Sequence, residues 1–375
     1  PPGAEDEAPI AAEAVLPPPP DLRRRLAWAL RAGLASSLLL GTTQQISTDM
    51  AAIPLLWAIT LLLYLVTFML AFGKRRLLPP ALLGLLTAAG AALTLVSLIA
   101  NLKHPSWFIV GLALAALFFG AWYCHDDLSR SAPDPRHLTQ FYLWIAIGGA
   151  AGGLATSLLA PQLLRGVGEY PLALAALIWL IHLGQRSGEG ERGGSRLLGA
   201  ALLALAALGL VWSAGGRSVM AQLPESLRPV VLLMPLLVLG LGSALSLWQR
   251  RLWPFAVATS LVALYVADGR HLPLDIEFQD RSFFGVVRVF HSERGERMIM
   301  HGTTIHGSEW VEGPLTGRAG MYYHREGVLA GLAQLLPAGG RMAMVGLGSG
   351  AMAGYLKSGQ ELVCFEIDPL VARVA

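Results

Sequence analysis

The sequence predicts a multi-span α-helical membrane domain, followed by a β-hairpin unit and the start of a Rossmann-like α/β domain. The first observation is composition: 54% of the 375 residues are hydrophobic and only 14% are charged, which places much of the chain in lipid. The second is a change near residue 275, where long apolar runs give way to alternating, strand-like segments. The third is a glycine turn between two short apolar strands close to the end of the sequence.

These changes divide the chain into four predicted parts. They are a disordered Pro/Ala linker over residues 1–21, a transmembrane domain of about eight spans over 22–270, a small β-hairpin and helix lead-in over 271–340, and a truncated nucleoside-binding β-α-β over 341–375. The sequence begins at Pro1, and Ala375 falls inside the helix expected after the second strand. We therefore expect a fragment of a longer protein.

Charge and cysteine usage exclude several functions. The net charge is only +3 and the basic residues fall in short loop clusters, so we expect no nucleic-acid partner. The cysteines, Cys124 and Cys364, offer neither a disulfide framework nor zinc-ligand spacing, and we predict no metal site. Residues 1–20 are acidic and rich in proline, which favours a linker over a signal peptide.

Apolar runs predict the membrane spans in order. Arg23–Arg25 precede a short first span, Leu26–Leu40, which a polar stretch follows up to Asp49. The second span, Ala51–Phe72, carries no charge over 22 residues and ends before Lys74–Arg76. These basic clusters place both flanks on the cytoplasmic side. Further candidates are Pro79–Ala100, Pro105–Cys124, Phe141–Leu164, Tyr170–Leu183, Leu197–Trp212, Val230–Trp248 and Leu252–Ala267.

The number of spans decides where the soluble part lies. Nine candidates from a cytoplasmic start would leave the nucleoside domain outside the cell, whereas sulfonium and nucleotide cosubstrates are made in the cytoplasm. The weakest candidates are the first span and Tyr170–Leu183, whose 14 residues make roughly 21 Å of helix against a hydrocarbon layer of about 30 Å. We therefore expect eight spans and a cytoplasmic soluble domain.

Two features inside the predicted spans are open to a functional interpretation. Gly148-Gly149 and Gly152-Gly153 lie four residues apart, which favours close helix packing, with a broken helix lining a substrate path as the alternative. Trp122–Asp127 ends a span with a histidine and two acids. We interpret it as a solvated helix end with aromatic anchors, and a cation or amine site is the alternative. His182 receives no role.

The soluble part predicts a hairpin unit and a helix. The expected elements are a strand at Phe283–Phe290, a turn at Ser292–Glu296, a partner strand at Arg297–Met300, a bend and third short strand at His301–Gly307, a Gly/Pro loop over a pocket at Trp310–Gly320, and a helix from Tyr322 to Leu336.

The glycine turn is the strongest local signal. Strand Met342–Val345 leads into Gly346-Leu-Gly-Ser-Gly350, a short helix and a second strand. Glycines allow a sharp turn that presents backbone N–H groups, and the following helix N-terminus favours an electron-rich group. Glu366 follows the second strand, where a carboxylate can accept hydrogen bonds from both hydroxyls of a ribose. Asp368 is the second acidic candidate. Gly346, Gly348 and Gly350 complete the predicted nucleoside site.

This order of elements resembles the polyamine aminopropyltransferases, the spermidine synthase family, over about Arg281–Ala375. With Pro54-Leu-Leu-Trp57, Phe141-Tyr-Leu-Trp144 and Arg281-Ser-Phe-Phe-Gly285, it is similar to the bacterial membrane-fused spermidine synthase-like proteins. The resemblance implies an inner-membrane location and decarboxylated S-adenosylmethionine held by the glycine turn and Glu366. Tyr323-His324 matches the family's Tyr-His pair beside the substrate.

The chain departs from that family at three places. Soluble synthases usually carry a glutamine at the position of Gly285, an acid at that of Arg325 and Asp-Gly at that of His301-Gly302. Because a cationic diamine favours carboxylates, Arg325 argues against ordinary putrescine binding. The family's catalytic aspartate is expected beyond Ala375, so the catalytic residue is unknown.

The function implied is aminopropyl transfer from decarboxylated S-adenosylmethionine to a small-molecule amine, by a protein embedded in the lipid bilayer. His306 and His324 are candidate bases or substrate contacts, with local structural roles as the alternative. One rival is a methyltransferase that uses S-adenosylmethionine. Another is a polyamine transporter or sensor with a non-catalytic nucleoside-binding domain, and a nicotinamide dehydrogenase ranks last. A homo-oligomer is left open.

Overall fold

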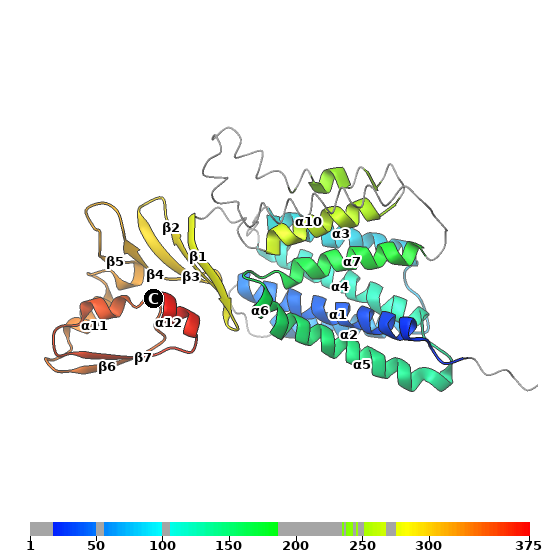
Figure 1. Ribbon diagram of the computed structural model, residues 1–375, viewed down its shortest axis with the longest axis horizontal. Helices are drawn as coiled ribbons and strands as arrows, with labels where there is room; N and C mark the ends of the chain where they lie inside the picture. Colours follow the sequence, from blue (N-terminus) through cyan, green and yellow to red (C-terminus); the bar gives the residue numbers. More distant parts are fainter. Residues whose placement is uncertain are drawn as a thin grey trace, which may run out of the picture.

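The computed structural model describes residues 18–49, 56–99, 106–186, 251–267 and 275–375, with a few positions between 235 and 246. A bundle of helices forms one part of the molecule, and a smaller part built on β-strands lies at one end of that bundle (Figure 1). The predicted order, helical region first and β-structure second, is confirmed. The bundle helices are α1 (Leu22–Asp49), α2 (Leu56–Ala71), α3 (Pro80–Ile99), α4 (Ser106–Arg130), α5 (Leu138–Leu154), α6 (Ala160–Leu163), α7 (Glu169–Arg186) and α10 (Trp253–Ala267).

Three helical segments in the described ranges are long and apolar enough to cross a membrane: Pro80–Ile99, Trp107–Arg130 and Pro135–Leu163. Three shorter apolar helices accompany them, at Trp57–Ala71, Glu169–Gly184 and Trp253–Ala267. The protein is therefore membrane-associated by the length and composition of its helices. The predicted span Leu197–Trp212 and most of Val230–Trp248 lie outside the described residues.

The first helix differs from its prediction. We expected the apolar span to end near Leu40, but α1 continues through the polar stretch to Asp49. Thr42 is fully buried, and the Thr43 hydroxyl lies 2.7 Å from the Leu39 carbonyl oxygen and 2.8 Å from the Thr60 hydroxyl of α2. Because the helix and its neighbour satisfy the Thr43 hydroxyl, this polar sequence remains helical inside the bundle.

Close packing of α1 on α5 explains the paired glycines. A Cβ on Gly148 would overlap the backbone of Ala29, and one on Gly152 would overlap the backbone of Gly33. Both positions therefore need glycine because two helix backbones touch there. After Leu154 the helix changes to a π-helical turn, Ala155–Leu159, before α6. The packing interpretation of these glycines is confirmed.

Basic residues gather at one end of the bundle, which we call the basic end. Arg23–Arg25 lie at the start of α1, and the Arg24 guanidinium donates to the Ser131 carbonyl oxygen just after α4, at 2.9 Å. Phe72, just before Lys74–Arg76, packs against the buried cluster around Trp28. The β-structure lies at the opposite end, beside α6 and the start of α7 (Figure 1).

An antiparallel sheet of five strands forms the first half of the soluble part. Its strands pair in chain order: β1 (Asp275–Ser282), β2 (Gly285–His291), β3 (Glu296–His301), β4 (Thr304–Trp310) and β5 (Ala319–Gly320). The sequence prediction merged Phe283-Phe284 into a strand, but these two residues form the turn between β1 and β2. β1 itself was not predicted.

The second half contains a parallel pair of strands, β6 (Arg341–Val345) and β7 (Glu361–Phe365). A 3-10 helix, Ala351–Tyr355, stands where we expected an α-helix, and α12 (Pro369–Val374) packs its Leu370 and Val371 against Val287 and Ile299 of the sheet. The helix predicted from Tyr322 is wrong in its start: α11 covers only Val328–Gln334. The residues before it form a 3-10 turn, Met321–Tyr323, which ends at an extended His324.

A buried ion pair joins the soluble part to the bundle. The Arg281 guanidinium donates to both carboxylate oxygens of Glu169, at 2.8 and 2.7 Å, and to the Gly166 carbonyl oxygen at 2.6 Å. The side chains of Arg281 and Glu169 are only 3% and 5% exposed. Gln279 adds a hydrogen bond from its amide to the Arg165 carbonyl oxygen. The β1–β2 hairpin is thus fixed against the start of α7.

Candidate functional site

The glycine turn adopts backbone conformations that favour glycine. Gly346, Gly348 and Gly350 have φ angles of +87°, +60° and +72°, all in the left-handed region. Gly348 is also closely covered, because a Cβ there would lie 2.8 Å from the Tyr323 hydroxyl. The turn connects β6 to the 3-10 helix and brings Leu347 and Ser349 between its glycines. Its shape follows directly from the three predicted glycines.

Glu366 lies against this turn, immediately after β7. Its Oε2 accepts the Leu347 backbone N–H at 2.8 Å, and its Oε1 accepts the Asp368 backbone N–H at 2.9 Å. The Asp368 N–H, aided by those of Leu347 and Ile367, lowers the pKa of Glu366, so the carboxylate is ionised at neutral pH. Each carboxylate oxygen can accept a second hydrogen bond. Glu366 can therefore hold the turn and still receive ligand hydroxyls.

Tyr323 and His306 lie on the other side of the same turn. The Tyr323 side chain is buried and reaches Gly348, and the His306 carbonyl oxygen lies 3.5 Å from the position of a Cβ on Gly348. Burial, with a smaller contribution from Cys364, raises the pKa of the Tyr323 hydroxyl, which stays a neutral donor. Burial and then the neighbouring His301 lower the pKa of His306, while Glu366 opposes them. His306 is thus neutral at pH 7 and can accept a proton.

His301 is a member of this cluster that the sequence reasoning did not assign. Its ring centroid lies 6.0 Å from that of His306, and its Nε2 lies 3.2 Å from the Phe284 carbonyl oxygen. A Cβ on Gly285 would lie 2.7 Å from the same Nε2. Gly285 and the His301 ring are therefore in close contact. Both residues differ from the pattern that the resemblance led us to expect, but no local sequence signal places them side by side.

Ser349 is the second residue that was not assigned. Its hydroxyl is buried and has no hydrogen-bond partner among the residues that the structure describes. It lies against Gly307, where an added Cβ would overlap it. A buried hydroxyl without a partner costs free energy, so the turn carries an unmet hydrogen bond at Ser349.

Two predicted residues take other positions. Asp368 is 1% exposed; its Oδ1 caps α12 by accepting the Leu370 N–H at 2.9 Å, and its Oδ2 accepts the Ser282 hydroxyl at 2.6 Å. Both oxygens of this carboxylate therefore have structural partners, and its contact with a ligand stays a prediction. His324 is exposed, and its Nδ1 accepts the Glu326 backbone N–H at 3.3 Å within a local turn.

A large open cavity of about 1170 Å³ is lined by residues of the five-stranded sheet and by residues of the region 325–375. It exceeds the usual volume of a small-molecule site. Ser349 and Gly307 line it, but none of the predicted site residues does. Its charged lining is mostly basic, from Arg297, Arg318, Arg325, Lys357 and Arg373. The face that carries Glu366 is therefore distinct from this cavity.

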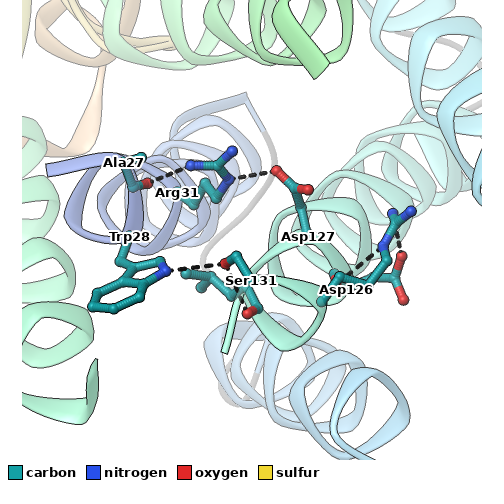
Figure 2. A network of polar contacts seen from close by, with 8 residues as sticks. Ala27, Trp28, Arg31, Asp126, Asp127 and Ser131 are labelled. Carbon is teal, nitrogen blue, oxygen red and sulfur yellow. Dashed lines mark hydrogen bonds and ion pairs between the residues drawn. The ribbon is translucent and has the colours of Figure 1, made fainter. Parts of the chain in front are cut away.

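The acids at the end of α4 are paired. Asp127 forms an ion pair with Arg31 of α1, and Asp126 pairs with Arg130 at 2.5 Å (Figure 2). The Trp28 indole N–H donates to the Ser131 hydroxyl at 3.1 Å in the same network. Because both carboxylates already have cationic partners, the network ties α1 to α4. It does not support the alternative interpretation as an amine site.

Comparisons with known proteins add no family to this geometry. No family model matches the chain, and no significant match was found among curated proteins or solved structures.

Proposed function

We propose that the soluble part binds an adenosine-containing ligand between the glycine turn and Glu366. The observation that supports it is the hydrogen bond from the Leu347 N–H to Glu366, which holds an ionised carboxylate beside the turn where the parallel strands β6 and β7 end. Ligands of open α/β sheets bind at the carboxyl ends of such strands, and a carboxylate there accepts ribose hydroxyls. A Rossmann-like domain that continues from these two strands is part of the proposal.

The reaction that we propose is aminopropyl transfer. A neutral amine attacks the propyl carbon beside the sulfonium of decarboxylated S-adenosylmethionine; the carbon–nitrogen bond forms, the carbon–sulfur bond breaks and methylthioadenosine leaves. His306 fits the task of accepting the proton from the amine because its pKa is lowered. The Tyr323 hydroxyl, which lies beside Gly348 and keeps its proton because its pKa is raised, can donate a hydrogen bond to the ligand. The spermidine synthase resemblance and this cluster support the assignment together.

A methyltransferase reaction with S-adenosylmethionine is the alternative within the same site. The residues beside the glycine turn include two imidazoles, His301 and His306, in place of an additional acid. A cationic amine favours carboxylates, whereas a neutral acceptor does not need them. This pairing of imidazoles supports an uncharged acceptor.

The placement of the sheet favours a second candidate function. Either enzyme needs the soluble part in the cytoplasm of a bacterial cell, where the cosubstrates are made. However, Arg23–Arg25 and Lys74–Arg76 lie at the end opposite the sheet, and the positive-inside rule assigns that basic end to the cytoplasm. In a bundle that crosses the bilayer, the basic end and the soluble part lie on opposite sides, so both cannot be cytoplasmic. The charge distribution supports a sensor or amine transporter whose nucleoside-binding part lies on the side of the membrane opposite the cytoplasm.

Thiol labelling separates the two candidates. Arg75→Cys at the basic end and Arg294→Cys in the β2–β3 turn, each in a Cys364→Ser background, are treated in intact cells with a membrane-impermeant maleimide. From the charges we expect position 75 to be protected and position 294 to be labelled, which would exclude a cytoplasmic enzyme. The reverse pattern would refute the charge argument and support aminopropyl transfer. Labelling of both positions would contradict a bundle that separates them across the membrane.

Ligand binding tests the site itself. Glu366→Gln keeps the shape of the side chain but removes charge-assisted hydrogen bonds worth about 1.5–3 kcal/mol, so the dissociation constant should rise roughly ten- to a hundredfold. Isothermal titration of the purified protein with S-adenosylmethionine, its decarboxylated form and methylthioadenosine measures this. The matched control is Glu361→Gln, an exposed acid at the start of β7 that pairs with Arg341. Equal binding by Glu366→Gln and the parent would remove the nucleoside assignment.

The pattern across ligands identifies the reaction. Preference for the decarboxylated donor supports aminopropyl transfer, and preference for S-adenosylmethionine supports methyl transfer. Binding of methylthioadenosine alone, without turnover of either donor, supports a sensor.

A further inference from the structure

A second cavity lies at the junction between the bundle and the β1–β2 hairpin. It has a volume of about 490 Å³, within the range of small-molecule sites. The segment Leu158–Arg165 forms one wall and the segment Asp280–Phe283 forms the other. A helix that spans a bilayer ends among the lipid headgroups, and the third segment long enough to span, Pro135–Leu163, ends at this cavity.

The charges that line the junction cavity leave one positive side chain without a partner. Arg281 is neutralised by Glu169, and Asp280 pairs with Arg373 at 3.0 Å. Arg165 is exposed, lies two residues beyond the end of the spanning segment and makes no ion pair with any described residue. Its guanidinium is free to bind a phosphate through two parallel hydrogen bonds.

Apolar side chains lead from the cavity along the surface that faces lipid. Leu158 and Leu163 are 47% and 78% exposed, and Phe283 at the tip of the hairpin is 73% exposed. In the apolar 18-residue window of Pro135–Leu163 only 22% of the residues are buried inside the structure, compared with 44% in the corresponding window of each of the other two segments. The helix that leads to the cavity is therefore the most lipid-exposed of the three, and an acyl chain can lie against it.

We propose that the junction cavity binds the headgroup of an anionic phospholipid. Its phosphate contacts the Arg165 guanidinium, and one acyl chain lies against Leu158 and Leu163. Gln162 provides a further polar group in the cavity lining, while Phe283 anchors the hairpin at the membrane surface. The site is separate from the glycine turn and does not depend on the proposed function.

Native mass spectrometry of the detergent-solubilised protein tests this proposal, with phosphatidylglycerol and phosphatidylcholine as probes. We expect phosphatidylglycerol to be retained preferentially, and Arg165→Gln to reduce its retention about fivefold, the effect of one arginine near an anionic surface. Arg165→Lys keeps the charge but loses the two parallel hydrogen bonds, so its loss of phosphatidylglycerol should be smaller than that of Arg165→Gln, and it guards against a loss that reflects misfolding. Leu163→Ser should reduce the retention of phosphatidylglycerol, because it removes a contact with the acyl chain. It should leave the binding of inorganic phosphate unchanged.

Arg136→Gln is the matched control, because Arg136 is an exposed arginine in the first turn of the same segment, Pro135–Leu163, whereas Arg165 follows its last residue. An equal loss in Arg136→Gln and Arg165→Gln would show diffuse attraction and overturn the proposal. If inorganic phosphate displaces phosphatidylglycerol and Leu163→Ser retains the lipid as well as the parent protein does, the cavity is a free-anion site and the lipid assignment is overturned. Equal retention of both lipids by the parent protein would also refute it.

Discussion

Replacing Arg281 by methionine should release the soluble part from the bundle. Arg281 and Glu169 are almost completely buried and share two hydrogen bonds, so the substitution leaves an ionised carboxylate desolvated and without its cation. Breaking a buried pair in this way costs about 3–5 kcal/mol. At 1.4 kcal/mol for each factor of ten, docking of the hairpin on α7 weakens roughly 100- to 4,000-fold.

Hydrogen–deuterium exchange of the two junction segments, residues 164–170 and 279–283, measures this change. Amides that docking protects exchange from the undocked state, so their rates should rise with the undocked population. Arg297→Met is the control: Arg297 and Glu309 also pair, at 3.4 Å, but their side chains are 46% and 49% exposed. A pair that is exposed in this way contributes at most about 1 kcal/mol.

The double variant Arg281→Met with Glu169→Met tests the reasoning most directly. It removes both buried charges, so it should exchange more slowly than Arg281→Met alone. If the double variant exchanges as fast as the single one, the cost does not come from an unpaired buried charge. If Arg281→Met and Arg297→Met behave alike, the ion pair does not hold the two parts together.

Two further predictions concern packing and pH. Gly152→Leu should separate α1 from α5 and lower the thermal stability by about 1–3 kcal/mol or more, whereas Gly149→Leu, whose Cβ meets nothing within 4 Å, should not; equal melting temperatures would contradict the packing argument. Because the folded-state pKa of His306 is lowered, stability should fall as pH drops below its unfolded value of about 6.5, and the lowered pKa of Glu366 should cause a further loss below about pH 4.5. Denaturant titrations across pH measure both losses. If His306→Gln still loses stability below about pH 6.5 as the parent does, the loss does not come from His306.

Long apolar helices were predictable because a chain in lipid must satisfy its backbone hydrogen bonds internally. Pro79–Ala100 was expected and Pro80–Ile99 is observed, since an uncharged run of this length can satisfy its backbone in a membrane only as a helix. The end of α1 was not predictable from local polarity. Thr43 is accommodated by Thr60 of another helix, a tertiary contact that composition does not contain.

The glycine turn and Glu366 were predictable for a local reason. Positive φ angles at Gly346, Gly348 and Gly350 follow from residue type, and the parallel pairing of β6 with β7 places the residue after β7 beside the turn. The role of Asp368 was not predictable, because its partner Ser282 lies 86 residues away in sequence. His301 was missed because its contact with Gly285 depends on the register of the sheet.

The two acids after β7 belong to a series of contacts that connects the glycine turn to the bundle. Glu366 accepts the Asp368 N–H, Asp368 accepts the Ser282 hydroxyl, and Ser282 follows Arg281, which Glu169 of α7 holds. Free energies of linked equilibria are reciprocal. If a ligand on Glu366 favours one arrangement of α7, then whatever shifts α7 must change the affinity for that ligand by the same factor. This series of contacts is the physical route by which a shift of α7 would reach a ligand at the turn.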